Sequence, residues 1–105
     1  MRNLRRYEIL LPLQFNDGQP VPESLLWQTV EEIEARFPAV SWESQVIRGL
    51  WQHEGVVFRD NNTRLFLDVP DLIENRDFFV DLKEKLKARF QQLEIWITSY
   101  PVDLI

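Results

Sequence analysis

Four charged side chains are the residues of this sequence best placed to do chemistry together. Glu8 lies in an early apolar stretch, Arg48 in a middle one, and Arg64 and Asp68 in the stretch TRLFLDV at residues 63–69. An arginine can fix an anionic ligand by two parallel hydrogen bonds, and a carboxylate can move a proton. Charges on strands more commonly pair with one another across the sheet. We favour this second interpretation.

Other signatures of catalysis or metal binding are weak. His53 is the single histidine; it lies in a predicted turn, His53-Glu54-Gly55, and no acid that would orient it as a general base is evident. The absence of cysteine excludes disulfides, thiol catalysis and cysteine zinc sites. The run 60–62 (Asp-Asn-Asn) lacks the spacing of a calcium loop and indicates a turn. We therefore expect no metal and no cofactor, and we favour a protein that is not an enzyme.

The element that must position these charges is a central strand at residues 63–69. Leu65, Leu67 and Val69 alternate with three residues of mixed character, which is the period of a strand. The Asp-Asn-Asn run precedes it as a predicted turn, and Pro70 ends it. Residues 56–59 either form a separate short strand or lengthen this one, and the pattern leaves both possibilities open.

The remaining elements follow from periodicity and from the positions of proline and glycine. The second helix begins either at a capping box, Asp71 to Glu74, or at Asn75. Pro22 and Pro38 bound the first helix, and Pro101 ends the last strand. The predicted strands are 5–14, 42–52 and 93–100, and the predicted helices are 22–37 and 71–90.

The order strand, helix, strand, strand, helix, strand predicts an α+β fold, a ferredoxin-like βαββαβ sandwich formed by one domain, residues 1–105. Right-handed crossovers give a four-stranded antiparallel sheet in the order 4-1-3-2, with both helices on one face. The face against the helices is predicted to carry Ile9, Leu11, Leu13, Leu65, Leu67, Ile95 and Ile97.

The opposite, open face of this sheet is the predicted binding surface. Leu10, Phe66 and Trp96 would form an apolar patch across three adjacent strands. Patches of this kind on a small protein commonly mark an interface or a ligand site. The same face would carry Glu8, Arg64, Asp68 and Thr98, and the register of residues 42–52 would add Arg48 or Trp51.

The net charge of -5 argues against nucleic acid or an anionic membrane surface as a partner. The basic residues late in the second helix are the exception, but Glu84 interrupts them; they are Lys83, Lys85, Lys87 and Arg89. No apolar stretch is long enough to span a membrane. A chain without cysteine is compatible with a reducing compartment, so we expect a cytoplasmic location.

Several short motifs are similar to those of a family of small uncharacterised bacterial proteins with a ferredoxin-like fold. They are RYEILLPL at residues 6–13, RFP at 36–38, GLW at 49–51 and LKARF at 86–90. The resemblance implies the fold and brings no catalytic residues with it. A more distant likeness to dimeric α+β barrel proteins rests on topology alone.

Two functions are consistent with these observations. The first is a module that forms a homodimer, or binds a protein partner, through the open face. The alternative is a small cofactor-free enzyme or ligand-binding protein with a pocket on the same face. In both, the site residues are Glu8, Leu10, Arg64, Phe66, Asp68 and Trp96.

Overall fold

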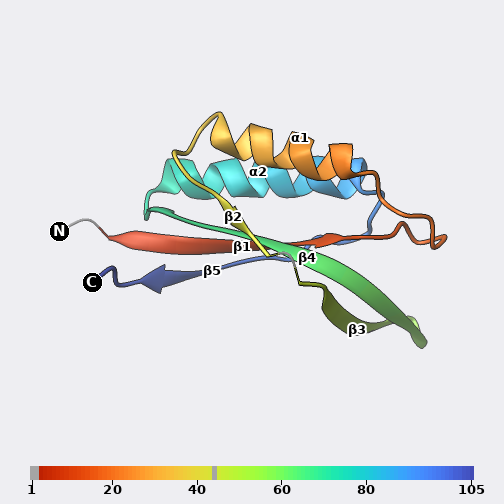
Figure 1. Ribbon diagram of the computed structural model, residues 1–105. Helices are drawn as coiled ribbons and strands as arrows, with labels where there is room; N and C mark the ends of the chain where they lie inside the picture. Colours follow the sequence, from red (N-terminus) through yellow and green to blue (C-terminus); the bar gives the residue numbers. More distant parts are fainter. Residues whose placement is uncertain (1–2, 44) are drawn as a thin grey trace.

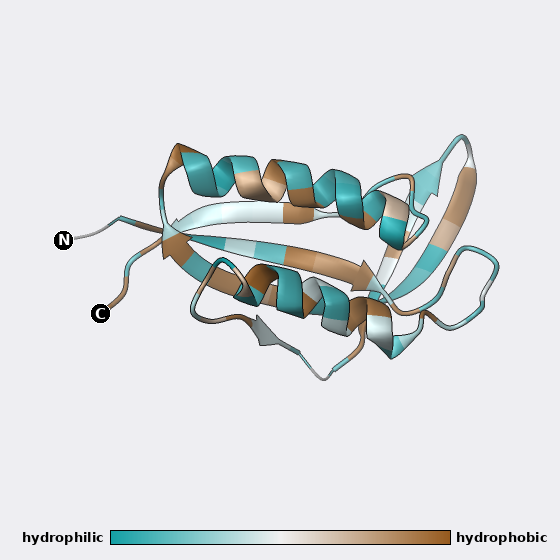
Figure 2. Cartoon of the chain, turned by 90° about the horizontal axis from the view of Figure 1, so that it is seen from above, coloured by the Kyte–Doolittle hydropathy of each residue, from teal (hydrophilic) through white to brown (hydrophobic). Residues whose placement is uncertain are grey.

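The computed structural model describes residues 3–43 and 45–105, which form two layers (Figure 1). Two helices lie side by side on one face of an antiparallel sheet, and the other face of the sheet is uncovered (Figures 1 and 2). The elements are β1 (Leu4–Pro12), α1 (Glu23–Glu34), β2 (Ser41–Trp42), β3 (Ile47–His53), β4 (Val56–Pro70), α2 (Ile73–Arg89) and β5 (Ile97–Val102).

The core lies between the sheet and the helices. The odd-numbered apolar side chains of β1 and β4 pack there against the apolar side chains of α1 and α2. Tyr7 stacks on Phe79 with ring centroids 4.0 Å apart, which joins β1 directly to α2. Leu13 and Ile97, predicted for this face, are only half-buried. The most deeply buried apolar side chains include Ile9, Leu11, Val30, Ile33, Leu65, Leu82, Leu86 and Phe90.

The predicted fold class, α+β and ferredoxin-like, is confirmed, but the sheet differs in detail from the four predicted strands. Its order is β2-β4-β1-β5, and β3 also pairs with β4. The single strand predicted at 42–52 is two strands: Ser41 and Trp42 pair with Phe66 and Leu65, and a separate ladder of β3 with β4 begins at Ile47 opposite Asn62. With these two pieces counted as one, the predicted order 4-1-3-2 is retained.

The predicted turn at residues 60–62 is wrong, because these residues lie within β4. They pair with residues 47–49 of β3, and Asn62 Nδ2 donates a hydrogen bond to the Ile47 carbonyl. The turn predicted at His53-Glu54-Gly55 is confirmed at Glu54 and Gly55, which have φ values of 51° and 78°. Residues 56–59 therefore lengthen the central strand, one of the two possibilities that the sequence leaves open.

Several predicted ends also move. The last strand is shifted from 93–100 to 97–102, and Pro101 lies inside it because an edge strand tolerates a missing N–H. β1 ends at Pro12 instead of residue 14, and α1 ends at Glu34, short of the predicted 37. The predicted capping box is wrong: α2 begins at Ile73 without a side-chain cap.

Residues 47–60, which we call the arm, extend beyond the ends of both helices (Figure 2). The arm is a two-stranded ribbon, and such ribbons have little stability on their own in water. It gives the chain a radius of gyration of 14.4 Å, whereas a compact chain of this length has roughly 13 Å. No helix in the described part of the chain is long and apolar enough to cross a membrane.

Candidate functional site: the open sheet face

The open face is formed by the even-numbered residues of β1, β4 and β5. Leu10 lies at its centre, opposite Arg64 of β4, and its N–H donates to the Trp96 carbonyl at 3.0 Å. Leu10 and Phe66 are half-buried, whereas the Trp96 side chain is 65% exposed. The three predicted patch residues therefore lie on one face, with the tryptophan most accessible.

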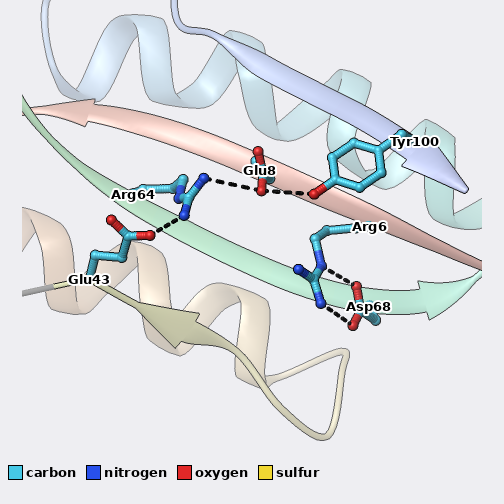
Figure 3. A network of polar contacts seen from close by, with 6 residues as sticks. All are labelled: Arg6, Glu8, Glu43, Arg64, Asp68 and Tyr100. Carbon is cyan, nitrogen blue, oxygen red and sulfur yellow. Dashed lines mark hydrogen bonds and ion pairs between the residues drawn. The ribbon is translucent and has the colours of Figure 1, made fainter. Parts of the chain in front are cut away.

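The charges on this face are paired, as Figure 3 shows. Arg6 and Asp68 are opposite each other on β1 and β4, and the guanidinium donates to both carboxylate oxygens at 2.7 and 2.9 Å. This hydrogen bonding lowers the pKa of Asp68 and raises that of Arg6. Two parallel bonds between a guanidinium and a carboxylate fix both side chains in one geometry.

Arg64 lies between two carboxylates. It donates to Glu8 at 3.3 Å and to Glu43, which follows β2. The hydrogen bond with Glu43 is the main reason that the pKa of Arg64 is raised. Tyr100 of β5 completes the network by donating its hydroxyl to the same Glu8 oxygen at 3.2 Å (Figure 3). One network thus joins residues from β1, β4 and β5 with the segment after β2.

Phe66 lies between the two arginines. The guanidinium carbon of Arg6 is 5.2 Å from the ring centroid, and that of Arg64 is 5.5 Å away. At these distances a cation is attracted by the π-electrons of the ring. The aromatic ring and the charges therefore form one continuous surface, and each arginine on it has a carboxylate partner.

Two concavities interrupt this surface. The smaller hollow, of about 250 Å³, is lined by Glu8, Leu10, Ile47, Arg64, Trp96 and Thr98. A larger groove, of about 390 Å³, lies between the arm and residues 92–96, which lead into β5. A third cavity, of about 260 Å³, lies on the helix side near Trp27 and Trp42.

The structure brings together some of the predicted site residues and separates others. Glu8 and Arg64 are in contact, but Asp68 is bonded to Arg6. The register of β3 places Trp51 on the open face and Arg48 on the opposite one, which resolves that alternative. The sequence pattern could have placed Arg6 on the open face, because it lies two residues before Glu8 in the same strand. The contacts of Glu43 and Tyr100 depend on the strand register, which the pattern does not show.

Other charged residues singled out in the sequence have local roles. Lys83 pairs with Glu94 at 2.9 Å, and Arg89 joins the two helices through Thr29 and Glu32. His53 ends β3 beside the exposed turn. No group of three or more metal-ligating side chains occurs within residues 3–43 and 45–105.

Neither a model of a known protein family nor a curated protein sequence matches this chain. Solved structures do. A phage SAM lyase in complex with S-methyl-5'-thioadenosine has 16% identity and a TM-score of 0.69 over 99% of this chain and 92% of that chain. CutA1 from Oryza sativa has 13% identity and a TM-score of 0.66, with 98% and 83% covered.

A third similar structure is the Bacillus cereus protein related to NIF3, at 9% identity and a TM-score of 0.61. The likeness covers 98% of this chain but only 26% of that protein. At such identities these comparisons show a shared ferredoxin-like α+β fold, and chemistry does not follow from fold.

Proposed function

We propose that this protein is a non-enzymatic module that forms a homodimer through its open sheet face. The observation that carries the proposal is the area of exposed surface. The chain exposes 7373 Å², whereas a compact monomer of its mass exposes roughly 6200 Å². The arm accounts for part of this excess through residues such as Leu50 and Val56, and the open face contributes through Trp96 and Tyr100. A stable interface buries about 800 Å² on each partner.

The chemistry of the face also supports self-association. Covering an apolar surface is favourable, and Trp96 and Tyr100 are among its most exposed side chains. Covering an unpaired charge is costly, but Arg6 and Arg64 already have carboxylate partners. A second copy can therefore cover this face without isolating either guanidinium.

A different protein partner could use the same surface, and the test below separates the two occupants.

We also propose a cytoplasmic location, because a chain without cysteine is suited to a reducing compartment. The motifs at residues 6–13 and 86–90 support kinship with small bacterial proteins of the same fold. The distant likeness to dimeric α+β barrels is in keeping with a dimer formed sheet to sheet.

The decisive experiment is the solution mass from light scattering for wild type, Trp96→Arg and Val80→Arg. Val80 on α2 is 57% exposed and lies away from the open face, so it is a matched control for an added charge. We expect a dimer for wild type and for Val80→Arg, and a folded monomer for Trp96→Arg. A wild-type monomer at high micromolar concentration would refute homodimerisation and leave a different partner as the occupant.

Ligand binding on the same face is the second candidate. It is favoured by the 250 Å³ hollow between Glu8, Arg64 and Trp96, and by the likeness to a lyase whose structure holds S-methyl-5'-thioadenosine. Binding is better supported than catalysis, because Glu8 already accepts hydrogen bonds from Arg64 and Tyr100. Both contacts are made to the same Glu8 oxygen, so this carboxylate is already engaged within the fold.

The test of this second candidate is a titration with S-methyl-5'-thioadenosine, followed by tryptophan fluorescence. We expect a saturable change that is lost in Trp96→Ala and retained in Trp27→Phe, where the replaced ring lies on the helix side. A linear response, or equal responses from both variants, would exclude this ligand from the hollow.

A further inference from the structure

The groove between the arm and residues 92–96 differs in chemistry from the hollow beside Arg64. Its walls come from a single chain: the arm contributes one side and the segment before β5 contributes the other. Its volume of about 390 Å³ lies within the range of small-molecule sites. The lining residues are Leu10, Pro12, Asn16, Trp51, Gln52, Phe58, Asp60, Asn62, Gln92, Leu93, Glu94, Ile95 and Trp96.

Three aromatic side chains contribute to this lining. Trp51 and Phe58 are opposite each other on the arm and stack with ring centroids 4.4 Å apart. Trp96 contributes from the other side and is mostly exposed. The faces of such rings carry negative electrostatic potential and attract a cation, and tryptophan does so most strongly.

The charged groups of the groove have one sign. Two carboxylates, Asp60 and Glu94, line it, and none of its lining residues is basic. Glu94 is occupied by Lys83 at 2.9 Å. Asp60 accepts a hydrogen bond from the neutral indole of Trp51 at 2.5 Å, and no ion pair of Asp60 occurs in the described part of the chain.

A half-buried carboxylate without a cationic partner is an unfavourable arrangement unless a cation can reach it. Asp60 is half-buried, and the ring of Trp51 is fixed beside it. A positively charged ligand would compensate the carboxylate while its apolar substituents cover the rings. The charge and the lining of the groove are thus complementary to the same kind of molecule.

We propose that this groove binds a small organic cation, such as a quaternary ammonium or sulfonium compound, between the aromatic rings and Asp60. One chain supplies every lining residue, so the site does not need a second copy, although Leu10 and Trp96 also belong to the open face. An anionic ligand is a poorer fit, since no lining residue is basic and Arg64, which lines the neighbouring hollow, is already paired with two carboxylates.

The test uses choline and its neutral isostere 3,3-dimethyl-1-butanol, which have the same shape and differ in charge. Each is titrated into the full chain up to about 100 mM, a concentration that saturates even a millimolar site. Tryptophan fluorescence and amide shifts of residues 51, 58 and 96 report binding. We expect choline to bind and the neutral isostere to bind at least about fivefold more weakly.

Variants assign the effect to the groove. Asp60→Asn keeps an oxygen for the indole of Trp51 but removes the charge, so we expect it to lose most of the preference for choline. Glu54→Gln makes the same change of charge at the tip of the arm, where the side chain is 86% exposed, and should bind as wild type does. Thermal unfolding of each variant shows that it is folded.

Three results would overturn the proposal: no saturable binding of choline, equal affinity for the isostere, or an unchanged preference in folded Asp60→Asn. Light scattering on the same samples reports self-association separately. A monomer that binds choline would refute the homodimer alone. Protein that binds no choline either as the dimer or after dilution to the monomer would refute the organic-cation site alone.

Discussion

Arg6 and Asp68 face each other across the two central strands and share two hydrogen bonds of 2.7 and 2.9 Å. This pair orders one end of the open face, as Arg64 and Glu8 order its middle. Because each arginine also lies over the Phe66 ring, the two pairs hold that ring in place. The geometry of the face is therefore set by charge pairing as much as by apolar contact.

The first prediction concerns the pH dependence of stability. Because hydrogen bonding by Arg6 lowers the pKa of Asp68 in the folded state, the ionised carboxylate stabilises the fold above its unfolded pKa of about 4. This contribution is lost as the pH falls through the lowered folded pKa. We expect Asp68→Asn to lower the urea midpoint at pH 7 and to differ less from wild type as the pH falls below about 4.

Asp103→Asn in the exposed C-terminal tail makes the same change of charge and is the control for this experiment. Its urea midpoint should follow that of wild type at every pH. A deficit of Asp68→Asn that is the same at pH 7 and in acid would show that ionisation of Asp68 does not contribute.

The second prediction concerns the core beneath the central strand. Leu65 is fully buried between the sheet and the helices, so Leu65→Ala should lower the free energy of unfolding by about 2–5 kcal/mol. Leu50→Ala on the arm is the matched control: its side chain is 67% exposed, and the expected loss is below about 0.5 kcal/mol. Chemical denaturation of both variants measures the difference, and equal losses would contradict this placement of β4.

The third prediction concerns the turn at the tip of the arm. Gly55 has φ of 78°, a conformation that costs a residue with a Cβ atom about 1–2 kcal/mol. We expect Gly55→Ala to speed amide hydrogen exchange in residues 47–60 while exchange in β1 stays as in wild type. Unchanged exchange in the arm would mean that the turn is not at Glu54-Gly55.

The fourth prediction concerns the contact between the helices. Arg89, whose side chain is 11% exposed, donates to Thr29 at 2.8 Å and to Glu32 at 3.1 Å. Arg89→Leu leaves a partly buried carboxylate unpaired, so we expect a loss of about 2 kcal/mol in the free energy of unfolding. Lys87→Ala removes only a surface pair with Glu84 and should cost about 0.3 kcal/mol. Equal losses in thermal denaturation would contradict a structural role for Arg89.

The sequence by itself determined the class of fold. Alternation at Leu65, Leu67 and Val69 marks a strand with one buried face, and steps of three and four from Leu26 to Phe37 mark a helix with a buried stripe. These periods arise from local backbone geometry, so they can be read without knowing what lies opposite. Because side chains alternate between the two faces along a strand, the same pattern places four predicted site residues on one face of the sheet: Glu8, Leu10, Phe66 and Trp96.

Only the tertiary structure decided which groups on that face touch. Asp68 bonds to Arg6 and Arg64 bonds to Glu43 because the strand register brings them together, and register depends on pairs distant in sequence. The Asp-Asn-Asn run has strong turn propensity, yet pairing with β3 holds it in a strand. Long-range hydrogen bonding thus overrides local preference, and it creates the arm and the groove that the sequence pattern does not reveal.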